Sequence, residues 1–146
     1  MLRENLRYFK NRNKKNKMTL AIWFIFSLIS GAVEAIVFHV DNKLSAKFHY
    51  KFGFDIHILF TVIRGIVALP LIYFTSYPVL SLVGFMLTFP FLHDGMYYFG
   101  RNFLDDRIYR KRWFDQSYST SAIFSINPFW RIILFALGLG LLPFYL

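Results

Sequence analysis

A run of 37 residues, from 56 to 92, is the feature that most constrains the fold, because only His57 and Arg64 in it can carry charge near neutral pH. A hydrocarbon core of about 30 Å needs roughly 20 helical residues, so the run is too long for one crossing and fits two. The break is expected at 75–78, where Pro78 suits the first position of a new helix. The run therefore predicts two membrane-spanning helices joined by a very short turn.

The composition extends this interpretation to the whole chain. The chain has 146 residues, of which 56% are hydrophobic, and 19 of them are Phe. This apolar share exceeds that of an ordinary globular domain and is concentrated in long blocks. The expected fold class is all-α, an integral membrane bundle of four transmembrane helices in a single domain. The chain has no cysteine, which excludes disulfides and thiolate metal sites.

The expected boundaries of the spans follow from the positions of the charged residues and of the helix-breaking Pro and Gly residues. A basic arm covers 1–17, and spans cover about 19–40, 56–74, 78–100 and 128–146, with a polar loop at 101–127. Pro70 predicts a kink, and Asn127-Pro128 has the form of a helix start. A cleaved signal peptide is an alternative for the first span, although the apolar run continues past Ala35. The alternating aromatics of 48–54 allow a short strand, but they favour an interfacial segment.

The strong positive charge points to a partner. The formal net charge is +9, and the arm alone holds seven Lys or Arg. Because the basic residues flank apolar spans and no nucleic-acid motif accompanies them, the expected partners are the lipid bilayer and anionic lipid headgroups, not nucleic acid. The two loops on the opposite face hold three and five Lys or Arg, so the count is nearly balanced. The N-terminus is expected to be cytoplasmic because the first span usually sets the orientation. The pattern leaves a homo-oligomer open.

The expected topology collects the ionisable groups of the spans at one end of the bundle. With a short turn between the second and third spans, the loops 41–55 and 101–127 lie on the same membrane face. Glu34 and Asp41 are seven residues apart, as are His57 and Arg64, and Asp94 and Arg101. Residues seven apart on a helix share a face, and charged faces avoid lipid, so these faces should meet. An ion pair between Glu34 and Arg64 is the simplest arrangement.

This end of the bundle is the candidate site, because ionisable groups at membrane depth indicate function. The candidate polar cluster comprises Glu34, His39, His57, Arg64, His93, Asp94, Arg101 and Asp115. Three interpretations compete. The charges pair only with one another and hold the helices together; or they bind a divalent metal; or the arginines bind an anionic headgroup or phosphate.

The metal interpretation depends on nitrogen and carboxylate ligands. Zn²⁺, Mn²⁺ or Fe²⁺ would suit such ligands better than Ca²⁺. No sequence motif such as HExxH places two candidate ligands on one helix turn, so several helices would have to contribute ligands. The candidate metal ligands are Glu34, His39, His57, His93 and Asp94.

The functional classes follow from these interpretations. A binding or structural membrane protein is favoured, and the alternative is a metal-dependent membrane enzyme that acts on a lipid headgroup or a phosphate ester. A channel is disfavoured, because the far half of each span carries no ionisable residue. No catalytic residue is assigned.

The stretch 89–101 is predicted to distort the third helix. Pro90 removes a backbone donor, and Gly95 permits a change of direction. His93 and Asp94 are adjacent and point about 100° apart on a helix, so they cannot face the same partner. Asp94 is expected to face the bundle axis, close to at least two of His39, His57, Arg64 and Arg101.

Overall fold

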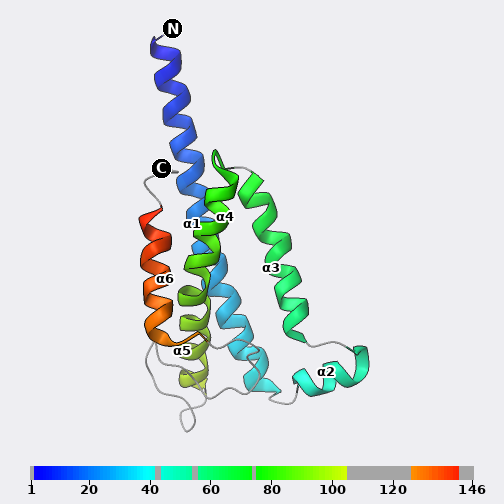
Figure 1. The fold of residues 1–146 in the computed structure, drawn as a ribbon. Helices are drawn as coiled ribbons and strands as arrows, with labels where there is room; N and C mark the ends of the chain where they lie inside the picture. Colours follow the sequence, from blue (N-terminus) through cyan, green and yellow to red (C-terminus); the bar gives the residue numbers. More distant parts are fainter. Residues whose placement is uncertain (1, 42–43, 54–55, 74, 105–125, 142–146) are drawn as a thin grey trace.

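A computed structural model describes residues 2–41, 44–53, 56–73, 75–104 and 126–141 (Figure 1). All regular structure within these ranges is helical, in agreement with the expected class. Three helical segments are long and apolar enough to cross a membrane: Lys10–Val40, Ile56–Tyr73 and Pro78–Leu104. A fourth apolar helix is shorter, so a bundle of four spans remains a prediction.

The first helix, α1, covers Leu2–Val40 without a break. The basic arm and the first span therefore form one helix, although the arm was expected to be a separate segment. Lys and Arg favour helix, and no Pro or Gly occurs before Gly31, so nothing in the sequence ends the helix at the membrane boundary. The segment that follows contains a second helix, α2 (Leu44–Phe52), which excludes the short strand for these residues.

The turn between the next two helices matches the expected break. Helix α3 covers Ile56–Tyr73 with Pro70 inside it, and α4 (Pro78–Phe89) begins at Pro78. A π-helical turn, η1 (Pro90–Asp94), follows directly and continues into α5 (Gly95–Leu104). Pro90 has no N–H to donate to the preceding turn, which explains why the regular pattern changes there. The predicted distortion near 90–95 is thus confirmed, and the helical segment that begins at Pro78 continues to Leu104.

The last helix, α6, covers Pro128–Gly140. Its start is the predicted cap, because the Asn127 side chain accepts a hydrogen bond from the Phe129 N–H at 3.0 Å. Thirteen helical residues measure about 20 Å, which is less than a full crossing. The rest of the fourth span predicted to 146 lies outside the described residues.

The helices run back and forth as the topology requires (Figure 1). The chain descends in α1, returns in α3, descends again through α4, η1 and α5, and rises in α6. The α3–α4 turn therefore lies at the same end as the basic segment of α1, whereas α2 and the start of α6 lie at the opposite end.

Small residues allow the closest helix contacts. At Gly31 of α1 an added Cβ would collide with the backbone carbonyl of His93, and at Gly138 of α6 it would come within 2.7 Å of Thr88. These approaches hold α1 against η1 and α5, and α6 against α4. Helix α3 packs more loosely, and only 6% of its apolar window is buried within the chain.

Candidate functional site

The predicted ion pair between Glu34 and Arg64 is present. The Arg64 guanidinium donates directly to the Glu34 carboxylate, which joins α3 to α1. The Glu34 side chain is buried, and 20% of the Arg64 side chain is exposed. Residues of two helices at comparable depth thus meet, as their spacing in the sequence indicated.

The same guanidinium reaches the distorted turn of the third helix. Arg64 Nη2 lies 2.9 Å from His93 Nε2, and His93 Nδ1 lies 3.0 Å from Asp94 Oδ1. One tautomer satisfies both contacts: Nδ1 donates its proton to Asp94, and Nε2 accepts from Arg64. In this arrangement Glu34 and His93 are both acceptors of Arg64, although Nε2 also lies 3.3 Å from Glu34 Oε1.

Asp94 continues the chain of contacts toward α6. Its Oδ2 atom lies 3.6 Å from Arg131 Nε, and that nitrogen also donates to the Ile126 carbonyl at 2.8 Å. The Arg131 guanidinium stacks on the Tyr98 ring, 4.8 Å from its centroid. His93 therefore faces α1 and α3 while Asp94 faces α6, as two adjacent residues on a helix should. Five residues are connected in this way, and we call them the polar network: Glu34, Arg64, His93, Asp94 and Arg131.

Arg131 is the member that the sequence analysis overlooked. It is 1% exposed and lies three residues after Pro128. Arg131 is an ionisable residue within a predicted span, and the same criterion identified Arg64 as a candidate. Asp94 was expected beside two of His39, His57, Arg64 and Arg101, whereas the contacts observed for it are with His93 and Arg131.

The remaining candidates occupy other positions. His39 is exposed in the last turn of α1, and His57 stacks on the Phe38 ring with centroids 5.2 Å apart. Arg101 is buried on α5. Asp115 lies outside the described residues. The structure thus brings together Glu34, Arg64, His93 and Asp94 from the predicted cluster.

The geometry does not support the metal interpretation. Among the described residues, no three His, Asp or Glu side chains are grouped so that they could hold a metal ion. The physical reason lies in the network itself. The Arg64 guanidinium sits against both Glu34 and His93, and a cation at that position repels a metal ion.

The formal charges of the polar network balance. Glu34 and Asp94 supply two carboxylates, and Arg64 and Arg131 supply two guanidinium groups. Within the described part of the chain, both terminal nitrogens of Arg131 are buried without a hydrogen-bond partner. Such donors are costly to leave unsatisfied, so the position beside Arg131 favours a hydrogen-bond acceptor over a cation.

Comparisons of the chain with protein families, with characterised proteins and with solved structures find no match.

Proposed function

We propose that this chain is a multi-pass integral membrane protein of the binding or structural class, in which the polar network joins the spans to one another. The observation that carries the proposal is the position of Arg64, which contacts Glu34 of α1 and His93 of η1 at once. A single side chain thereby links three helical segments. This role suits polar groups in membranes, where an unpaired charge is expensive.

The exposed surface supports membrane insertion. Large apolar residues along α1 recur at helical spacing on its outer face, and Ile56 is the one residue of α3 that is buried. In water such surfaces would drive aggregation, whereas lipid tails cover them without cost. The exposed α1 residues that form this face are Ile22, Ile25, Ile29, Val33 and Ile36.

A chelator separates the proposal from the metal-enzyme alternative. A metal bound to the native state would stabilise it, so its removal would lower the midpoint of unfolding. We expect EDTA to leave the thermal midpoint of the detergent-solubilised protein unchanged, and added Zn²⁺ or Mn²⁺ not to raise it. A midpoint that falls with EDTA and recovers with one of these metals would favour the metal enzyme.

The absence of cysteine makes the topology directly measurable by single-cysteine labelling. The variants Asn13→Cys and Gln116→Cys place one thiol in the basic arm and one in the polar loop. With a cytoplasmic N-terminus, an impermeant maleimide should label Gln116→Cys in intact cells, and Asn13→Cys only after permeabilisation. The reverse pattern would invert the orientation, and labelling of both from the same side would contradict the four spans.

A further inference from the structure

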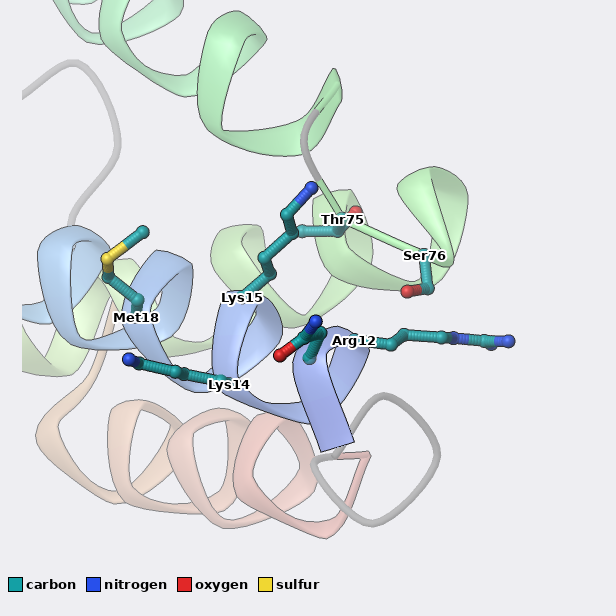
Figure 2. A pocket seen from close by; sticks show the side chains of 7 residues that line it. Arg12, Lys14, Lys15, Met18, Thr75 and Ser76 are labelled. Atoms are coloured by element: carbon teal, nitrogen blue, oxygen red, sulfur yellow. The ribbon is translucent and has the colours of Figure 1, made fainter. Parts of the chain in front are cut away.

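Figure 2 shows a basic pocket close to the α3–α4 turn. It has a volume of about 650 Å³, which is within the range of small-molecule sites. The basic segment of α1 forms one wall, and the α3–α4 turn forms the other. Its described lining residues are Asn11, Arg12, Lys14, Lys15, Met18, Thr75 and Ser76.

We propose that this pocket binds the phosphate group of an anionic phospholipid. Three of the described lining residues are cationic and none is acidic, so an anion is the ligand that fits. The Thr75 and Ser76 hydroxyls on the opposite wall donate their single protons to the Ile72 carbonyl and to Asn16 Oδ1, so the cationic side chains are the donors that remain for a phosphate. Phosphate oxygens accept charge-assisted hydrogen bonds from ammonium and guanidinium groups.

The walls of the pocket are held in place by contacts between the two elements. Asn16 is buried, and its Oδ1 atom accepts from the Ser76 N–H and from the Ser76 hydroxyl, each at 3.3 Å. The Arg12 guanidinium packs on the Tyr77 ring, 4.7 Å from its centroid. These contacts fix the turn against α1. The pocket is thus an open depression between two elements that contact each other, although Lys14 and Lys15 themselves are exposed.

The position of the pocket along α1 favours a lipid headgroup over a soluble anion as the ligand. The Lys and Arg residues of α1 end at Lys17, and the apolar segment begins with Met18, which also lines the pocket. If α1 spans the membrane as proposed above, the pocket lies at the level of the headgroups. Basic pockets next to transmembrane helices are suited to anionic headgroups at this level. The inference therefore rests on the proposed membrane placement.

Two double variants on the same helix isolate the pocket from the general charge of the arm. Lys14→Gln/Lys15→Gln removes two lining cations, whereas Lys10→Gln/Lys17→Gln removes two lysines that do not line the pocket; all four side chains are exposed. Both variants lose the same charge. Binding of phosphatidylglycerol, with phosphatidylcholine as the neutral reference, is measured by native mass spectrometry of the detergent-solubilised protein at 150 mM salt.

We expect the pocket variant to bind phosphatidylglycerol about 30-fold more weakly than the wild type, since each cation near a headgroup contributes about 1 kcal/mol. The control variant should lose at most about threefold, because Lys10 and Lys17 do not line the pocket and act on the lipid only through the screened general charge of the arm. Lys14→Arg/Lys15→Arg should retain binding, which shows that charge at these positions is responsible. Equal losses in the two Gln variants, or equal affinity for the two lipids, would overturn the inference.

Competition with inorganic phosphate tests whether the pocket binds the phosphate group of a lipid or free phosphate from solution. We expect 10 mM phosphate to compete weakly, because it lacks the acyl chains that hold a lipid at the headgroup level. The lipid assignment would be overturned if phosphate displaced the lipid from the wild type and if its own binding were lost in Lys14→Gln/Lys15→Gln. Alkaline carbonate extraction tests the membrane placement separately: release of the protein from membranes would refute the proposed function, whatever the lipid measurements show.

Discussion

Glu34 and Arg64, 30 residues apart in the sequence, form an ion pair between α1 and α3, and His93 accepts from the same guanidinium. This pair links the loosely packed α3 to the other helices. The removal of either partner leaves a charge at membrane depth without its counterion.

We expect Glu34→Leu and Arg64→Met each to lower the free energy of unfolding by about 3 kcal/mol, the lower end of the range for a broken buried pair, because Arg64 is partly exposed. The double variant should recover most of this loss, since two apolar side chains can replace a buried pair. Equilibrium unfolding by sodium dodecyl sulfate in mixed micelles, followed by circular dichroism, gives the three values. Additive losses would show that the pair contributes no coupling.

Asp94 supports Arg131 from the adjacent helix turn, so its charge is expected to matter for the docking of α6. Asp94→Asn keeps the shape of the side chain but removes the counterion of a guanidinium that is 1% exposed. We expect a loss of about 1–3 kcal/mol in the same unfolding measurement. Asp94→Asn combined with Arg131→Met should be more stable than Asp94→Asn alone, because Met can still pack on Tyr98. If Asp94→Asn were as stable as the wild type, the contact would contribute nothing to folding.

Gly31 permits the close approach of α1 to the π-helical turn. In Gly31→Ala the new methyl group would collide with the His93 carbonyl, a backbone atom that cannot move independently of its helix. We expect a destabilisation of about 1–3 kcal/mol, as for other overpacked positions.

Gly65→Ala is the matched control, because nothing lies within 4 Å of the added atom on α3. This variant should be neutral, or more stable by up to about 1 kcal/mol through helix propensity. Thermal unfolding in a single detergent compares the two substitutions. Equal midpoints would contradict the tight crossing at Gly31.

The docking of α6 against α4 can be tested with two glycines two residues apart. Gly138→Leu would place its side chain against Thr88, Leu87 and the Gly84 carbonyl, whereas Gly140 has nothing within 4 Å. We expect Gly138→Leu to detach α6 and Gly140→Leu to leave it in place. Limited proteolysis of the 105–125 segment, followed by gel filtration in detergent, measures whether α6 stays bound. Retention of α6 in both variants would place its docking surface elsewhere.

The sequence by itself determined the helical class, the turn before Pro78, the distortion after Pro90 and the pairing of Glu34 with Arg64. Each of these depends on local chemistry or on the depth of a residue along a helix. A proline lacks its N–H wherever it stands, and an ionisable residue in an apolar run needs a partner at its own depth. These constraints do not depend on which helices become neighbours in the folded protein.

Only the tertiary structure decided which helices are neighbours and therefore which partner each group obtains. Asp94 contacts Arg131 because α6 docks beside η1, and the spacing of charges within the third span carries no information about that position. The basic pocket likewise requires the α3–α4 turn to lie against the last turns of the basic segment of α1, where Ser76 contacts Asn16, 60 residues earlier in the sequence. Helical periodicity fixes the face and the depth of a side chain, but the packing of small residues such as Gly31 and Gly138 selects the surface that it meets.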